Sequence, residues 1–198
     1  TEIEALRTPE ERFAVLPNFP YQPRYLEGLP GFEGLRLHYV DEGPPDAENL
    51  FLCLHGEPTW AYLYRKMIPV FTGAGCRVVA PDFFGFGRSD KLASQEDYSY
   101  AKHEAWLEAF IVGMNLENIL LVCQDWGGLL GLRLVARHPE RFAGVVAANT
   151  FLPTGKEELG EAFEAWRSYV AGASPTGTTS ETTGSICTVP CWCRKRST

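Results

Sequence analysis

Strand-like apolar runs alternate with helix-like segments along most of this 198-residue chain. Four of these runs are largely apolar throughout, as strands buried on both faces of a parallel sheet are: Leu50–Leu54, Arg77–Ala80, Ile119–Cys123 and Ala143–Ala148. A fifth run, Leu35–Val40, alternates in the manner of a half-buried strand. The alternation predicts an α/β fold, with a mostly parallel twisted sheet and helices on both of its faces.

Three helices are predicted beside these strands. Tyr100–Met114 has apolar residues at spacings of three and four, which gives a helix one apolar face. A second helix is predicted over Gly127–Arg137, because Pro139 prevents its continuation. A third is predicted to begin at Thr154, since Thr154 and Glu157 have the spacing of a capping box.

The charge balance and the hydropathy exclude two classes of partner. The formal net charge is -7, and the one basic cluster, Arg194–Arg196, stands at the C-terminal end, so no nucleic-acid partner is expected. No apolar run approaches the roughly 18 to 20 residues that cross a bilayer, and the first residues lack a basic-then-apolar signal. We therefore expect a cytoplasmic protein that binds no membrane.

The six cysteines form two groups. The first lies in apolar runs and is predicted to consist of buried, reduced thiols: Cys53, Cys76 and Cys123. The second stands near the C-terminus: Cys187, Cys191 and Cys193. No zinc site is predicted there, because the usual two-residue spacing and a nearby histidine are both missing. We expect neither a metal nor a cofactor.

The segment Ile119–Gly128 has the form of a nucleophile elbow, a buried strand that turns directly into a helix. Such a turn strains the backbone, so the residues two before and two after its apex must be small. Here they are Cys123 and Gly127, which puts Asp125 at the apex as the candidate nucleophile. A simpler interpretation is that Asp125 only caps the following helix.

A second motif, His55-Gly56-Glu57-Pro58-Thr59-Trp60, follows the strand Leu50–Leu54 directly. This is where an α/β-hydrolase places the loop that gives one backbone amide to the oxyanion hole, and we assign that amide to Glu57. The other amide comes from the residue after the nucleophile, Trp126. His55 could be read as a general base, but a structural role behind this loop is favoured.

A third motif, Pro81–Asp90, contains Gly85 and Gly87 after a strand. It is not a dinucleotide fingerprint, because the third glycine and the helix that must follow at once are missing. Ser89 does not stand in a G-x-S-x-G motif either, so a serine hydrolase is not supported.

Together, in this order, the three motifs resemble those of the haloalkane dehalogenases, in particular the subfamily with H-G-E-P-T and Q-D-W-G motifs. The resemblance runs from about Phe13 to Val170. It implies an α/β-hydrolase fold in which Asp125 attacks the carbon of a halogenated alkane, with Trp126 donating its indole N–H to the departing halide. It also implies that Trp166 is the second halide-binding tryptophan; ordinary packing on an apolar helix face is the less favoured alternative.

The chain departs from the family at the general base and the third acid of the catalytic triad. Its four histidines are His38, His55, His103 and His138, and none follows a late strand. His103 and His138 are expected to be surface or capping residues. We therefore find no residue for either role.

The resemblance also sets the expected domain boundaries. Residues 13–152 are predicted to form the N-terminal part of the hydrolase core, and residues 153–172 to begin the helical cap. Residues 173–198, rich at first in Ser, Thr, Gly and Pro, are predicted to be a disordered tail foreign to the family. A shifted reading frame or altered gene is favoured there, because Ala143–Ala148 would otherwise form an uncovered parallel edge strand. We expect a monomer.

Two other functions remain open. An epoxide hydrolase uses the same aspartate elbow but needs cap tyrosines to protonate the epoxide oxygen, and only Tyr169 is a candidate. Glu57 favours the dehalogenase, since epoxide hydrolases usually have an aromatic residue at this position. The missing histidine would also suit a non-catalytic ligand-binding protein, although such a protein has no physical reason to keep the elbow.

Overall fold

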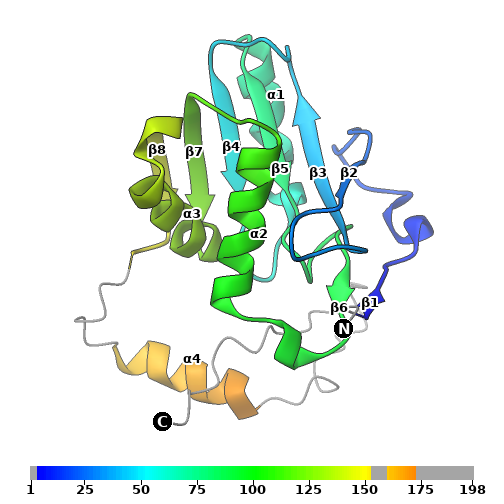
Figure 1. Cartoon of the computed structure of the whole chain (residues 1–198), viewed down its shortest axis with the longest axis vertical. Helices are drawn as coiled ribbons and strands as arrows, with labels where there is room; N and C mark the ends of the chain where they lie inside the picture. The colour runs from blue at the N-terminus through cyan, green and yellow to red at the C-terminus, as the bar shows by residue number, and fades with distance from the viewer. Residues whose placement is uncertain (1–3, 153–159, 173–198) are drawn as a thin grey trace.

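The structure, a computed structural model, describes residues 4–152 and 160–172. Six strands form the main sheet in the order β2-β3-β5-β4-β7-β8. Their bounds are Arg24–Glu27 (β2), Arg36–Glu42 (β3), Leu50–Leu54 (β4), Arg77–Pro81 (β5), Ile119–Gln124 (β7) and Phe142–Ala148 (β8). Strands β5, β4, β7 and β8 run parallel, whereas β3 is antiparallel to both of its neighbours (Figure 1). The predicted α/β fold with a mostly parallel sheet is confirmed.

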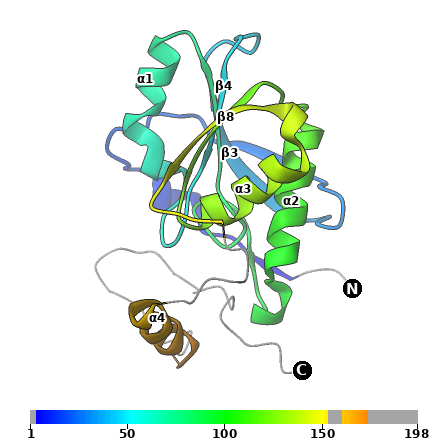
Figure 2. The same ribbon diagram turned by 90° about the vertical axis from the view of Figure 1, so that its left-hand side faces the viewer.

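Helices lie on both faces of this sheet. Helix α1 covers one face, and α2 and α3 cover the other (Figure 2). The helices span Ile68–Gly73 (α1), Tyr100–Gly113 (α2), Trp126–Arg137 (α3) and Glu161–Gly172 (α4). Four 3-10 helices, Glu10–Phe13 (η1), Ala61–Lys66 (η2), Gln95–Asp97 (η3) and Pro139–Arg141 (η4), and a small sheet of Ala5–Leu6 (β1) with Lys91–Leu92 (β6) complete the described elements. The predicted bounds of α2 and α3 hold to within one residue.

The apolar runs form a separate core on each face of the sheet. The larger core lies under α2 and α3, where Trp106 and Phe110 of α2 are buried against Leu52 of the central strand β4. The smaller core lies under α1, where Ile68 packs near Val78 of β5. Burial on both faces explains why the central strands are apolar without interruption.

Strand β8 forms one edge of the sheet. Among the described residues it pairs only with β7, and most of its side chains are exposed. Val145 is 40% exposed and Val146 57% exposed, whereas Leu121 and Val122, their partners on β7, are buried. This is the uncovered edge that the sequence led us to expect.

Three expectations need correction or lie beyond what the structure describes. Cys53 and Cys123 are buried free thiols as predicted, but Cys76 is only partly buried, because it precedes β5 instead of lying within it. Helix α4 begins at Glu161, and the proposed cap at Thr154 lies outside the described residues. So does the predicted tail, residues 173–198. None of the described helices is long and apolar enough to cross a membrane.

Candidate active site

Asp125 is the single residue between the end of β7 and the start of α3. Its backbone angles, φ 53° and ψ −125°, lie in a region that residues with a side chain rarely occupy. The turn is tight because α3 passes close to β4: a Cβ on Gly127 would lie 2.7 Å from His55 O and closer still to Leu54 O. The structure thus has the strained strand-to-helix turn that the small flanking residues predict.

The two strands next to β7 send their following loops to Asp125. After β4, the backbone N–H of Glu57 donates to Oδ1 of the Asp125 carboxylate at 2.9 Å. After β8, Asn149 O accepts from the Asp125 N–H at 3.3 Å, and Thr150 Oγ1 donates to Asp125 O at 2.8 Å. The site therefore lies at the carboxyl edge of the parallel strands, where open α/β sheets bind their ligands.

Sequence reasoning did not single out Asn149 and Thr150. Asn149 adopts a positive φ of 47°, and Thr150 fills the space beside Gly128 that a Cβ there would need. The available signal was their position, because both directly follow the parallel strand next to β7.

The Glu57 loop approaches Asp125 closely enough to require a glycine. A Cβ on Gly56 would lie 2.8 Å from Asp125 Cγ and closer still to Asp125 Oδ1. Strands β4 and β7 are paired up to Leu54 and Cys123, so both loops leave the sheet at the same level. Burial, together with a smaller effect of the Asp125 charge, raises the pKa of the Glu57 carboxyl to about 7.

Of the two tryptophans predicted to bind the halide, only Trp126 has a described side chain. Trp126 opens helix α3, is partly buried, and packs against the larger core. Trp166 belongs to α4, but its side chain lies outside the described residues. Helix α4 stands apart from the sheet in Figure 2. Tyr169 of the same helix, the candidate cap tyrosine, is 70% exposed.

His55 is fully buried behind the Glu57 loop, and both of its ring nitrogens are occupied. Phe83 N donates to Nε2 at 2.9 Å, so Nδ1 must carry the proton that it shares with Gly56 O at 2.9 Å. Burial lowers the pKa of His55, which keeps the ring neutral. These contacts give His55 a structural position and leave it no free nitrogen for a water.

His38 is also buried, and it pairs with a buried carboxylate. Its Nδ1 lies 2.8 Å from Asp82 Oδ2, and Asp82 also accepts from Ala61 N and Arg88 N, each at 2.8 Å. Burial alone would raise the pKa of Asp82, but the contact with His38 and the hydrogen bond from Ala61 N outweigh it and lower this pKa. This network fixes the loop after β5 and does not involve Asp125.

The expectation of a surface role for His103 is wrong. Its side chain is 2% exposed, because α2 turns it toward the loop after β5, where it accepts from Trp106 Nε1 at 3.2 Å. Burial lowers the pKa of His103 to about 3.

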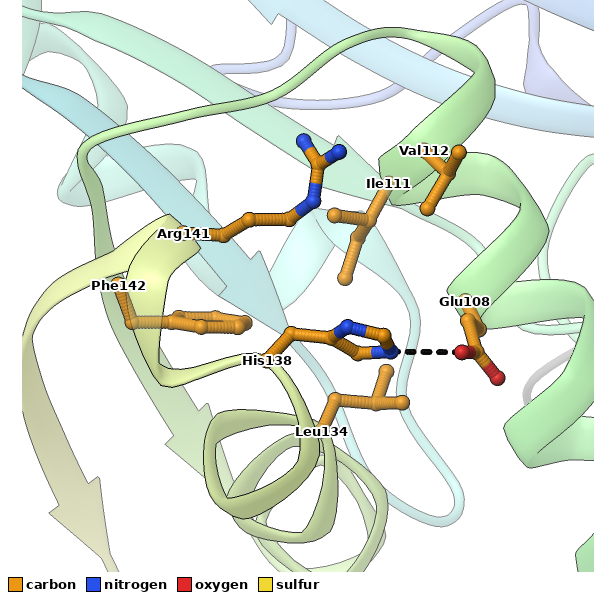
Figure 3. A pocket seen from close by; sticks show the side chains of 7 residues that line it. All are labelled: Glu108, Ile111, Val112, Leu134, His138, Arg141 and Phe142. Carbon is orange, nitrogen blue, oxygen red and sulfur yellow. Dashed lines mark hydrogen bonds and ion pairs between the residues drawn. The ribbon is translucent and has the colours of Figure 1, made fainter.

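His138 caps the far end of α3. Its Nε2 lies 2.6 Å from Glu108 Oε1 in a small crevice between α2 and the C-terminal end of α3 (Figure 3). A 12-residue helix is about 18 Å long, and Asp125 stands at the other end of α3. His138 is a capping residue as expected, and it is remote from Asp125.

A family model described as the alpha/beta hydrolase fold matches residues 49–176, which is more than half of the chain. The chain belongs to the α/β-hydrolase family. The residues that surround Asp125 lie within the matched part of the chain.

Similar proteins include several haloalkane dehalogenases. One from Psychrobacter cryohalolentis is 55% identical over 168 residues, which are 84% of this chain and 55% of that protein. A tetrameric haloalkane dehalogenase from Paraglaciecola agarilytica is also 55% identical, with a TM-score of 0.83 over 87% of this chain and 57% of the other. An epoxide hydrolase from Vigna radiata is 26% identical, with a TM-score of 0.61 over 76% of this chain and 47% of the other.

The resemblance to haloalkane dehalogenases is thus confirmed, and the similarity to epoxide hydrolases is more distant. The chain spans about half the length of the curated relatives that it matches.

Proposed function

We propose that this chain carries the nucleophile of a haloalkane dehalogenase. One oxygen of Asp125 displaces the halide from a saturated carbon and forms an alkyl ester; water then attacks the ester carbonyl carbon and releases an alcohol and a proton. The observation that carries the proposal is the Asp125 carboxylate at the elbow, 2.9 Å from the Glu57 N–H. The high identity to dehalogenases supports the halogenated alkane as substrate.

The Glu57 N–H donates to Oδ1 of Asp125, the oxygen that would become negatively charged during hydrolysis of the ester. If Oδ2 attacks the substrate, Oδ1 becomes the ester carbonyl oxygen and gains negative charge when water adds to the ester. The backbone amide of Trp126 is the proposed second donor. We assign the halide to the indole N–H groups of Trp126 and Trp166, because an anion in an apolar pocket needs donors already directed at it.

The contacts of the histidines suggest that this 198-residue polypeptide forms the alkyl ester but does not hydrolyse it. His38 pairs with Asp82, His55 bridges Gly56 and Phe83, His103 bonds Trp106, and His138 pairs with Glu108. No hydrogen bond found among the described residues joins any of them to Asp125. Without a base the ester should persist.

Intact-mass analysis tests whether Asp125 is alkylated and whether the ester persists. Incubation with a short bromoalkane should add one alkyl group per chain and release one bromide, with peptide mapping placing the group on Asp125. Asp125→Asn keeps an acceptor for the Glu57 N–H and should form no adduct. Steady bromide release without an adduct, or an adduct on the Asn variant, contradicts the proposal. Styrene oxide is the parallel reagent: an adduct with it and none with the bromoalkane would favour an epoxide hydrolase.

The remaining assignments are also proposals. Residues 13–152 form a partial hydrolase core, residues 153–172 begin the cap, and residues 173–198 are a tail outside the family. The family match up to residue 176 supports the second assignment. We place the protein in the cytoplasm. We propose a monomer, and sedimentation velocity would test this against the tetramer of the Paraglaciecola relative.

A further inference from the structure

The Gly56–Glu57 peptide is the group that presents its N–H to the nucleophile, and its carbonyl has an unusual set of partners. Three donors meet at Gly56 O, each at 2.9 Å: the His55 Nδ1–H, the Thr59 N–H and the Thr59 hydroxyl. A carbonyl oxygen has two lone pairs, so this one is saturated.

Peptide geometry links these donors to the active site. The Gly56–Glu57 bond is trans and planar, so its C=O and N–H point in opposite directions. Whatever holds the Gly56 carbonyl on the side of His55 and Thr59 therefore directs the Glu57 N–H toward the opposite side, where Asp125 Oδ1 accepts it at 2.9 Å. A rotation of this peptide would lose all four hydrogen bonds together.

We propose that Thr59 is a positioning residue for the reaction: its hydroxyl and amide, with the His55 imidazole, hold the Gly56 carbonyl and so aim the Glu57 amide at Asp125. The inference rests on the proposed function, because it assigns Thr59 a role in presenting the oxyanion donor. Two of the three donors come from Thr59, and its hydroxyl can be removed without touching the backbone. His55 supplies the third from a fully buried position.

The positioned Glu57 N–H should act in the hydrolysis of the ester. When hydroxide adds to the ester carbonyl carbon, the negative charge moves to Oδ1; the alkoxide then leaves and takes the proton of the new Asp125 carboxyl group, which releases the alcohol and restores the carboxylate. The aimed Glu57 N–H stabilises the charge on Oδ1 without having to reorient. Loss of a whole oxyanion donor slows related reactions by about a hundredfold or more, and a loosened donor should have a smaller effect.

The test compares three variants by two measurements. Thr59→Val removes the hydroxyl at nearly constant volume, and Thr59→Ser restores it. Thr72→Val is the matched control, because the Thr72 hydroxyl also donates to a backbone carbonyl, that of Ile68 at 3.1 Å, but in α1. The first measurement is the amide hydrogen-exchange rate of Glu57. The second is the decay of the alkyl ester, formed beforehand with a short bromoalkane, after a jump to alkaline pH.

In Thr59→Val, the Glu57 amide should exchange about three- to tenfold faster, as expected for one lost hydrogen bond. The ester should also decay about threefold more slowly. Thr59→Ser and Thr72→Val should match the wild type in both. The inference is overturned if Thr59→Val exchanges at the wild-type rate, or if Thr59→Ser behaves like Thr59→Val. Should the wild type form no ester, the proposed function fails, while the exchange rates still decide the role of Thr59.

Discussion

Gly127→Ala should weaken the fold even though it places the best helix-forming residue within a helix. Gly127 is the second residue of α3. A Cβ there would lie 2.6 Å from Leu54 C and 2.7 Å from His55 O, inside the 3.0 Å that such atoms essentially never pass. Both neighbours are backbone atoms at the end of β4, so neither can swing aside.

The magnitude follows from two opposing effects. Alanine gains at most about 1 kcal/mol over glycine from its helix propensity. Overpacking against a fixed neighbour costs about 1 to 3 kcal/mol, and more where the backbone must move. We expect a net loss of about 2 kcal/mol in the free energy of unfolding. The displaced helix should also move Asp125 from the Glu57 N–H, so less of the chain should be alkylated.

Urea unfolding followed by circular dichroism measures this loss, and an unchanged m-value would show that only stability has changed. Gly113→Ala is the control. Gly113 ends α2, nothing lies within 4 Å of the point that a Cβ would occupy there, and the variant should keep or slightly raise stability. A Gly127→Ala chain as stable as Gly113→Ala would refute the argument that β4 and α3 leave no room for a Cβ.

Two further predictions concern Glu57 and the β8 edge. Because folding raises the pKa of Glu57 from 4.5 to about 7, its contribution to stability is fully present below about pH 4.5 and lost as the pH rises through 7. Between about pH 5 and pH 8 the wild type should therefore lose about 1 to 2 kcal/mol relative to Glu57→Gln, allowing for solvent screening, and parallel urea curves would contradict this. Val146→Lys, a charge on the exposed edge strand, should reduce aggregation on heating, followed by light scattering. Val112→Lys on α2, where Val112 is 47% exposed, should have no such effect. Equal effects of the two lysines would contradict a special role of the β8 edge.

Local sequence patterns predicted the elements that lie around the nucleophile. The apolar run ending at Cys123 and the small Gly127 were enough to place Asp125 at a strained turn, because strand burial and turn crowding are local properties. The same patterns missed the antiparallel β2, whose four residues are exposed or only partly buried and so give little apolar signal.

The contacts between segments could not be predicted in the same way. His103 has the sequence surroundings of an exposed helical residue, yet the loop carrying Phe83 packs over that side of α2 and buries it. Thr150 likewise gains its partner, Asp125 O, only when β7 and β8 are adjacent. Strand order is set by the whole chain, so these roles become visible only in three dimensions.

The sheet itself sets the position of Asp125 relative to the two loops that contact it. Glu57, Asp125 and Thr150 leave adjacent strands, so their separations are governed by a strand spacing of about 4.8 Å and cannot drift independently. A change that displaces one of these strands would therefore move the Asp125 carboxylate and the groups that contact it together.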